Sequence, residues 1–151
     1  MKHWLMKSEP STYSIDDLAR DKCTLWEGVR NYQARNFMMK DMKVGDDFIF
    51  YHSSAEPSSA AGLGRITRVC IPDSTALNKK SEYYDAKATI DNPIWYCVEV
   101  KFLEKFAHPQ SLDDLRAAKA LSNMLLLKRG TRLSVQPLTP DEFQIICKMG
   151  Q

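Results

Sequence analysis

The stretch from Trp26 to Phe37, WEGVRNYQARNF, gathers side chains suited to directional polar binding. It holds two arginines, two asparagines and a glutamine, and residues 28 to 39 contain no Lys, Glu or Asp. Guanidinium and amide groups are planar and hold their donors and acceptors in fixed directions. The stretch therefore predicts a binding surface or an anchor for neighbouring loops, with a plain exposed helix face as the alternative.

Trp26 opens this stretch and precedes Gly28, which places it at a predicted turn. An aromatic ring at a turn, flanked by Asn, Arg and Gln, is the material of a pocket that stacks on a nucleobase. The alternative is a core tryptophan that covers the edge of a sheet. The residues alone favour the core tryptophan.

Catalytic motifs are absent from the sequence: it has no nucleophile elbow, no zinc-protease helix and no phosphate-binding loop. His52 and Ser53 adjoin at the end of a predicted strand, where a catalytic pair is conceivable, although a structural histidine is the commoner explanation. The four cysteines have no metal-ligand spacing, so we expect reduced thiols, a cytoplasmic protein, and neither metal nor cofactor.

Positive charge is unevenly distributed, although the formal net charge is only +2. Arg30, Arg35 and Lys40 follow one another with no acid between them. A second acid-free run, residues 115–140, carries Arg116, Lys119, Lys128, Arg129 and Arg132. If the two runs meet in space they form a modest basic surface, and if not they are scattered solvated charges. No apolar run approaches the length of a membrane span, so we expect no membrane partner.

The elements that must position these residues follow from hydrophobic periodicity and helix-start signals. The predicted strands are 3–7, 47–53, 63–71, 95–106 and 132–138. The predicted helices are 15–21, 31–42, 111–118, 120–127 and one that starts at 139, while 53–62 and 72–93 are predicted to be mostly irregular. Because strands and helices do not strictly alternate, we predict one α+β domain, residues 1–151, with a mixed or antiparallel curved sheet.

Several segments, in order from His3 to about Ile146, together resemble the EVE-domain family: HWLMKSEP, GVRNYQARN, FYHS and RLSVQP. The resemblance implies a PUA-like fold, in which a curved mixed sheet forms a small pseudo-barrel surrounded by helices. It also implies kinship with YTH and ASCH domains, which bind nucleic acids or modified bases. The implied protein is a monomeric module that binds a modified nucleobase of DNA or RNA, flipped or single-stranded, without chemistry of its own.

Carried over to this sequence, the resemblance places the pocket residues in four segments. They are Lys7, Ser8, Trp26, Gly28, Val29, Asn31, Tyr51, His52 and Ser53, with Ser134 as a weaker candidate. The residues expected to hold phosphates are Arg30, Arg35, Lys128, Arg129 and Arg132. The family pattern has a Pro-Gly pair after FYHS, whereas here Pro57 is followed by Ser58, which leaves the shape of the 57–61 loop and the choice of ligand open.

Two further hypotheses belong to other functional classes. A small hydrolase acting on a modified nucleobase or an amide would use His52 with Ser53 or Lys7, because some ASCH relatives are associated with such hydrolysis. A protein-interaction module would use the Ser-rich loop of residues 53–61. No specific motif supports the interaction module.

Overall fold

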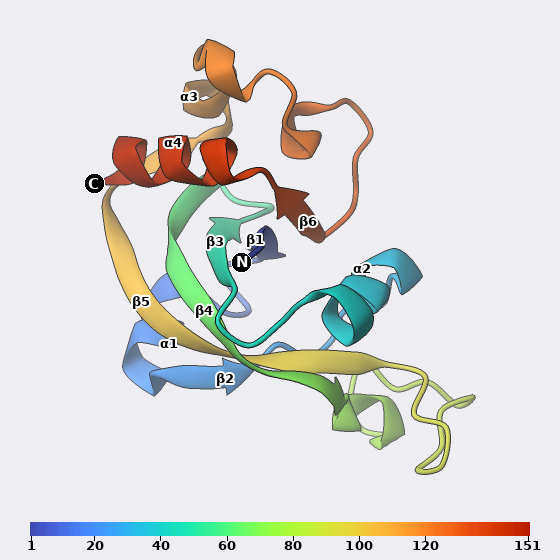
Figure 1. The fold of residues 1–151 in the computed structure, drawn as a ribbon. Coiled ribbons are helices and arrows are strands. Elements are labelled where there is room, and N and C mark those ends of the chain that lie inside the picture. The colour runs from blue at the N-terminus through green and yellow to red at the C-terminus, as the bar shows by residue number, and fades with distance from the viewer.

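The computed structural model describes all residues from 1 to 151. At its centre lies a six-stranded sheet in the order β2-β5-β4-β3-β1-β6 (Figure 1). The strands are β1 (His3–Ser8), β2 (Cys23–Leu25), β3 (Asp47–His52), β4 (Ser59–Pro72), β5 (Tyr96–Ser111) and β6 (Val135–Leu138). β1 pairs with β3 in parallel and every other pair is antiparallel. The sheet is therefore mixed, as predicted.

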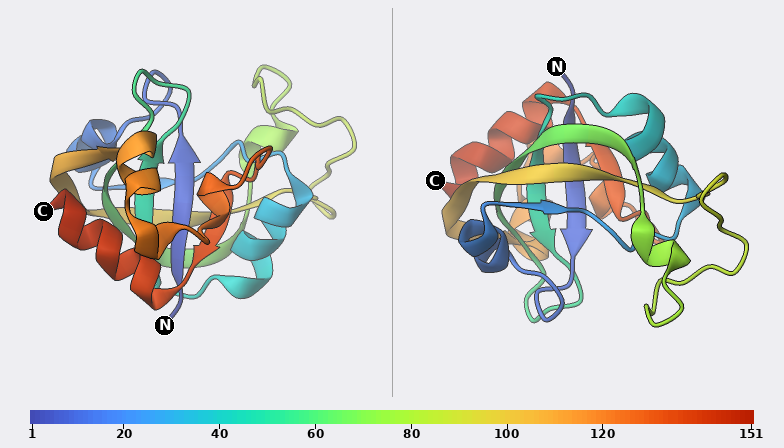
Figure 2. Two further views of the ribbon diagram at one scale, coloured as in Figure 1. Left: turned by 90° about the horizontal axis from the view of Figure 1, so that it is seen from above. Right: turned by 90° about the horizontal axis from the view of Figure 1, so that it is seen from below.

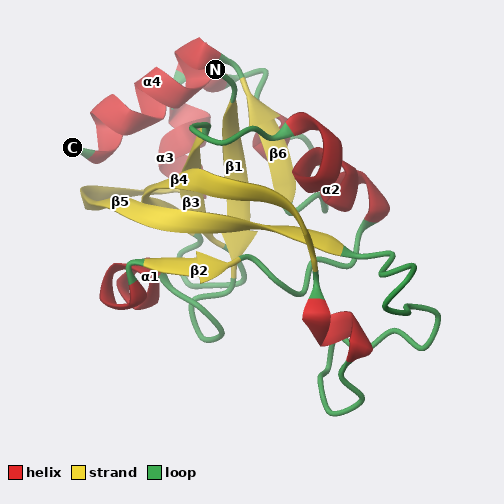
Figure 3. Cartoon of the chain, turned by 60° about the horizontal axis from the view of Figure 1, so that its bottom comes forward, coloured by secondary structure: helices red, strands yellow, loops and turns green.

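The sheet is strongly curved, because the long strands β4 and β5 bend across the direction of β1 and β6 (Figure 3). The register of the β4–β5 pair shifts at several points, including those beside Gly62 and Gly64. A Cβ atom on Gly62 would collide with the carbonyl oxygen of Glu104, and one on Gly64 with the ring of Phe48. These glycines mark bulges and close backbone approach, and bulges increase the twist of a sheet. The sheet curves without closing, since β2 and β6 lie at its two edges.

Short helices surround the sheet (Figure 2). They are α1 (Ile15–Asp21), α2 (Tyr32–Asn36), which continues into a π-helical turn (Phe37–Asp41), α3 (Leu112–Ala117) and α4 (Pro140–Gly150). Three 3₁₀ turns complete the set: Ser74–Leu77, Lys119–Leu121 and Leu125–Leu127. Ser14, Ser111 and Thr139 form capping boxes at the starts of α1, α3 and α4. None of these helices has both the length and the apolar composition needed to cross a membrane.

Alternation along the inner strands divides the interior into two cores. On one face Trp4 and Met6 pack with Phe48 and Phe50, under α1 and the helical segment that begins with α2. On the other face Leu5, Ile49 and Tyr51 pack beneath α3 and α4. We call these the first and the second core. The cleft described below borders the first core.

Some predicted elements were wrong in extent or type. β4 begins at Ser59, inside the predicted 53–62 loop, because its small residues Ala60 and Ala61 are buried against the cores in spite of their weak strand propensity. β5 continues to Ser111 and β6 begins only at Val135. The predicted helix 120–127 consists of two 3₁₀ turns, and β2 was not predicted because it has only three residues.

His52, at the end of β3, is a structural residue that fixes the start of α1. Its Nε2 atom accepts a hydrogen bond from the backbone N–H of Ile15 at 3.0 Å, and its ring meets Phe50 edge-on at 5.5 Å. An accepting Nε2 must be unprotonated. Burial lowers the pKa of His52, an effect that the nearby Asp16 opposes and Lys105 reinforces.

Replacing His52 by alanine should lower the free energy of unfolding by about 1 kcal/mol at pH 7.5, because the N–H of Ile15 loses its acceptor. Because folding lowers the pKa of His52, its contribution is complete above the ordinary histidine pKa of about 6.5 and is lost as the pH falls below it. The free energy of unfolding, measured in urea at pH 7.5 and 5.5, should therefore fall more between the two pH values for the wild type than for His52→Ala. His108→Ala, at an exposed position, is the control. Equal losses in wild type and His52→Ala would contradict this role.

Candidate functional site

A cleft of about 560 Å³ opens where the end of β1 meets β2, the segment after it and the residues just before β6. This volume lies within the range of small-molecule sites in proteins. The predicted residues that line it are Lys7, Ser8, Trp26, Gly28, Val29 and Ser134, together with Arg30. The backbone N–H of Lys7 donates to the carbonyl of Ser134 at 2.8 Å, and that of Trp26 donates to the carbonyl of Val98 on β5 at 2.8 Å.

Four predicted pocket residues do not line the cleft. Tyr51 is only 3% exposed and packs in the second core, because strand alternation sends it to the opposite face of the sheet. Asn31 is the N-cap of α2, where its side chain accepts from a backbone N–H at 2.9 Å. His52 caps α1, and the backbone N–H of Ser53 donates to the carbonyl of Ser8.

Trp26 forms part of the cleft wall while belonging to the first core. It is 7% exposed, and its ring meets Phe48 and Phe50 edge-on at 5.7 and 5.3 Å. The interpretation of Trp26 as a core residue therefore holds, although part of the ring also lines the cleft. Most of the ring supports the sheet, and only a small part of it is available to a ligand.

Asp73, which follows β4, holds the cleft wall in place. Its side chain is 1% exposed and accepts hydrogen bonds from the backbone N–H of Gly28 at 2.8 Å, from Arg30 at 3.0 Å, and from both the backbone and the hydroxyl of Thr75. Burial alone would raise the pKa of Asp73, but the hydrogen bonds from Thr75, Gly28 and Arg30 outweigh it and hold the pKa below its ordinary value. The wall segment is thus tied to a residue 45 positions further along the chain.

Arg30 lines the cleft, yet its guanidinium group is saturated within the chain. Nε and Nη2 donate to the carbonyl of Tyr83 at 3.0 and 2.7 Å, and Nη2 also donates to Thr75. Nη1 donates to the carbonyl of Val29 and to Asp73. A guanidinium has five N–H groups, and all of them are engaged here. Arg30 therefore acts as a tie that holds the 82–83 segment against the cleft.

Gly28 permits a close contact between two walls of the cleft. Its φ is +87°, a conformation that favours glycine, and a Cβ atom here would lie 2.7 Å from the ring of Tyr83. The absence of a side chain at Gly28 therefore lets two segments of the chain approach closely. The partner in that close approach is Tyr83 of the chain itself.

The cleft has a polar floor and an acidic rim. Lys7 is partly buried, which lowers its pKa with no acidic side chain to offset the effect. Ser8 donates its hydroxyl to the carbonyl of Tyr13 at 2.6 Å. Glu9, Glu27 and Glu82 line the cleft and are exposed at its edge. Burial, and then the charge of Asp73, raise the pKa of Glu27. Such a cleft suits a neutral polar ligand better than a phosphate.

The predicted phosphate-binding residues fall into two groups. Lys128, Arg129 and Arg132 are exposed, take part in none of the ion pairs, and lie in the segment that runs into Ser134 at the cleft. Arg35 lies on α2 and donates to the carbonyl of Ile94 at 2.9 Å. Arg35 therefore anchors a neighbouring loop, and its predicted contact with a phosphate stays a prediction.

Sequence reasoning missed more than half of the residues that line the cleft. They are Glu9, Thr12, Tyr13, Thr24, Leu25, Glu27, Glu82 and Tyr83. Glu27 lies inside the stretch that drew attention, between Trp26 and Gly28, so adjacency could have included it. Asp73 and Tyr83 come from an irregular segment with no periodicity to link them to β1 or β2.

The geometry argues against two of the three residues on which the hydrolase hypothesis depends. The lone pair of His52 Nε2 is engaged with Ile15, and neither His52 nor Ser53 lines the cleft. A general base must reach the proton that it abstracts. Of the three residues in that hypothesis, only Lys7 faces a ligand in the cleft.

Comparison with known proteins identifies relatives over nearly the whole chain. The EVE domain family model matches residues 2–149. Human thymocyte nuclear protein 1 is 40% identical over 99% of this chain and 74% of its own length. A solved protein from Pseudomonas putida is 46% identical with a TM-score of 0.94, covering 99% of both chains.

Two further solved structures bear on ligand and fold. The human THYN1 protein in complex with DNA that contains 5-methylcytosine is 39% identical, with a TM-score of 0.92 over 100% of this chain and 98% of that one. An ASCH mutant protein from Zymomonas mobilis is only 12% identical but covers 100% of both chains with a TM-score of 0.57, which shows a shared fold alone. The predicted α+β, PUA-like fold is thereby confirmed.

Asp73→Asn should lower the free energy of unfolding by about 3 kcal/mol, because it leaves the charge of Arg30 half-buried and unpaired. Asp47→Asn is the matched control: it breaks a 2.7 Å pair with Arg65 whose arginine is 39% exposed, and should cost less than about 1 kcal/mol. Because the pKa of Asp73 is lowered, its contribution is present above the ordinary carboxyl pKa and is lost as the pH falls through the folded-state value. Urea titrations measure the free energy of unfolding of both variants. Equal losses of stability in the two variants would show that Asp73 does not hold the cleft wall in place.

Proposed function

This chain belongs to the EVE domain family, and we propose that it binds DNA carrying a modified base, with that base held in the cleft. The observation that carries the proposal is the likeness to human THYN1 in complex with 5-methylcytosine DNA, which extends over the whole of this chain. A modified cytosine is therefore the first base to test. Single-stranded RNA with a modified base is a second ligand for the same cleft.

The chemistry of the cleft supports a base as the ligand. Lys7 offers an ammonium donor, Ser134 a hydroxyl, and Glu27 a carboxylate acceptor. The edge of cytosine presents an amino donor and two acceptors, so both kinds of group find partners. The acidic rim disfavours a phosphate inside the cleft, which leaves the neutral base as the part of a nucleotide that enters.

Simple energetics limit how selective such a site can be. Burying one methyl group contributes about 0.8 kcal/mol, or roughly fourfold in affinity. Extracting a base from a duplex costs a few kcal/mol, so an unpaired base should bind more tightly than a paired one. We therefore propose moderate affinity, with strong selectivity only for a modification that adds a hydrogen bond.

The phosphate contacts of this proposal lie on one side of the cleft. Lys128, Arg129 and Arg132 are free, exposed cations on the segment that leads to Ser134. We leave Arg30 out of the set because its donors are saturated within the chain. The strand backbone then runs beside residues 128–132, away from the glutamates of the rim.

A panel of oligonucleotides with modified and unmodified bases tests the proposal when wild type is compared with Gly28→Ala. We expect a modified oligonucleotide to bind more tightly than its plain counterpart. Gly28→Ala should weaken that binding by about tenfold or more, because the new Cβ displaces Tyr83 from the cleft wall. Trp26→Ala is a poorer probe, since most of that ring belongs to the first core.

Gly45→Ala is the matched control. Gly45 also has a positive φ, +98°, but a Cβ atom there would meet only the end of Met1 at 3.9 Å. Its backbone strain is therefore comparable, while the cleft is untouched. No preference for any modified base by the wild type, or equal weakening by both variants, would refute the proposal.

The salt dependence of binding tests the proposed phosphate contacts. Changing Lys128, Arg129 and Arg132 together to alanine should make the slope of log K against log salt shallower by up to about 0.9 per lost contact on duplex DNA. Replacing Lys2, Lys40 and Lys43 together by alanine is the control, because it removes the same amount of charge elsewhere. The backbone N–H groups of Lys2 and Lys43 contact Asp46 near the start of β1, whereas the cleft lies at the end of β1. An unchanged slope in the first variant, or the same change in both, would show that residues 128–132 do not contact phosphates. A wild-type slope steeper than about −6 would also exceed what this charge distribution can supply.

A further inference from the structure

A column of aromatic rings and guanidinium groups runs from the cleft wall to the surface of α2. The guanidinium carbon of Arg30 lies 5.6 Å from the ring centre of Tyr83 and 5.1 Å from that of Trp95. Trp95 in turn stacks on Tyr32, with ring centres 4.8 Å apart and planes inclined by 22°. The guanidinium of Arg35 lies 4.8 Å from the centre of the Tyr32 ring. The column thus links a residue of the cleft to the outer surface of the helix.

The two rings of this stacked pair differ sharply in their exposure to solvent. Trp95 is 5% exposed, whereas Tyr32 is 59% exposed. Arg35 beside it donates to the carbonyl of Ile94 and to the amide of Asn36, and none of the ion pairs includes it. An open aromatic ring next to a cation without an acidic partner is complementary to a nucleotide, which presents a flat base and a negative phosphate.

Several contacts hold this surface rigid before any ligand arrives. The indole N–H of Trp95 donates to Asp85 at 2.8 Å, and Arg35 ties α2 to the carbonyl before Trp95. Figure 2 shows the loop that carries Trp95 extending beyond the sheet beside α2. A platform already ordered in the free protein loses little side-chain freedom on binding.

We propose that Tyr32 and Arg35 form a second contact for the strand whose modified base occupies the cleft. The ring of Tyr32 stacks on the base of a flanking nucleotide, and Arg35 contacts the adjacent phosphate. This inference rests on the proposed function, because it assumes that the ligand of the cleft is part of a strand. It predicts that the protein binds a modified base within an oligonucleotide better than the free nucleoside.

The test uses single-stranded oligonucleotides with 5-methylcytosine in which the flanking base on each side is present or replaced by an abasic residue. For the wild type, a flanking base on one side should increase affinity about fivefold or more, the usual effect of one stacked base. Tyr32→Ala should abolish this increase, and Tyr32→Phe should retain it, because phenylalanine keeps the ring. Thermal unfolding of each variant checks that the contact with Trp95 is not needed for folding.

Ile90→Ala is the control, because Ile90 is an apolar residue that is 86% exposed outside the column. A flanking-base effect that persists in Tyr32→Ala, or that is absent from the wild type, would overturn the inference. The proposed function fails in a different way: the wild type would then show no preference for 5-methylcytosine in any flanking context. The two failures are therefore distinguishable in one set of titrations.

Discussion

The cleft depends on one buried carboxylate. Asp73 lies at the end of β4, where its side chain is almost inaccessible to water, and it accepts from the backbone of Gly28, the guanidinium of Arg30 and two groups of Thr75. A buried carboxylate is strongly unfavourable unless hydrogen bonds and a countercharge surround it. Here these partners come from the cleft wall itself. The hydrogen bonds that Asp73 needs can form only when the wall segment occupies its observed position. The burial of this one charge therefore fixes the position of the wall.

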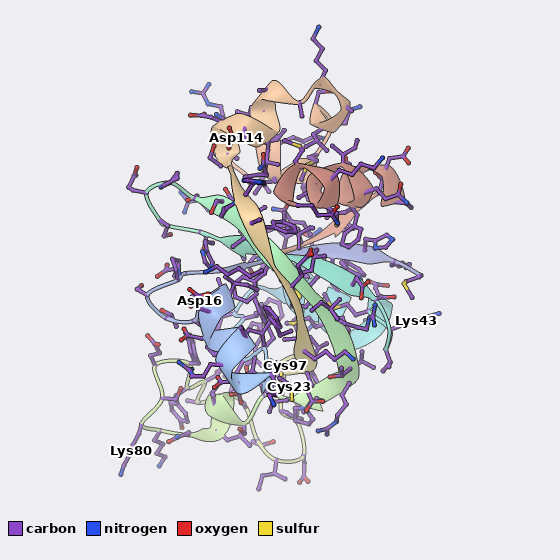
Figure 4. The ribbon with its side chains drawn as sticks, turned by 90° about the vertical axis from the view of Figure 1, so that its left-hand side faces the viewer. Asp16, Cys23, Lys43, Lys80, Cys97 and Asp114 are labelled. Atoms are coloured by element: carbon purple, nitrogen blue, oxygen red, sulfur yellow. The ribbon has the colours of Figure 1, made fainter.

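The same constraint orders a long segment with little secondary structure. Between β4 and β5, one 3₁₀ turn is the only regular element, and a small apolar cluster of Ala76, Ala88 and Trp95 is the only local core. Arg30 and Arg35 hold this segment in place of regular secondary structure. They donate hydrogen bonds to the carbonyls of Tyr83 and Ile94 and contact the Trp95 ring. Figure 4 shows Lys80 of this segment at the opposite end of the molecule from Asp114. The planar polar residues that made the stretch after Trp26 distinctive are largely internal ties.

Features with local signals could be predicted from the sequence, and features that depend on distant partners could not. The capping boxes at Ser14, Ser111 and Thr139 each lie within four residues, so the predicted helix starts were correct. β3 is apolar at four consecutive positions, Phe48 to Tyr51, so its sequence contains no alternation that assigns each residue to a face. Tyr51, which the family resemblance placed in the pocket, lies in the second core, and no alternation in β3 could have corrected that expectation. The link from Asp73 to Gly28 and Arg30 has no local signal in the sequence, because these partners lie more than 40 residues away.

The distribution of charge around the cleft restricts how a strand can approach it. Glu9, Glu27 and Glu82 stand at the rim, while exposed cations of residues 128–132 that form no ion pair lead to Ser134 at the cleft. A phosphate that crossed the acidic side would meet like charges, and one that followed residues 128–132 would meet opposite charges. A strand held on the basic side can still present its base to Lys7 at the floor, because Lys7 and Ser134 are joined by a backbone hydrogen bond. Under the proposed function, selectivity comes from the fit of a neutral base between polar groups, and the phosphates contribute affinity and orientation.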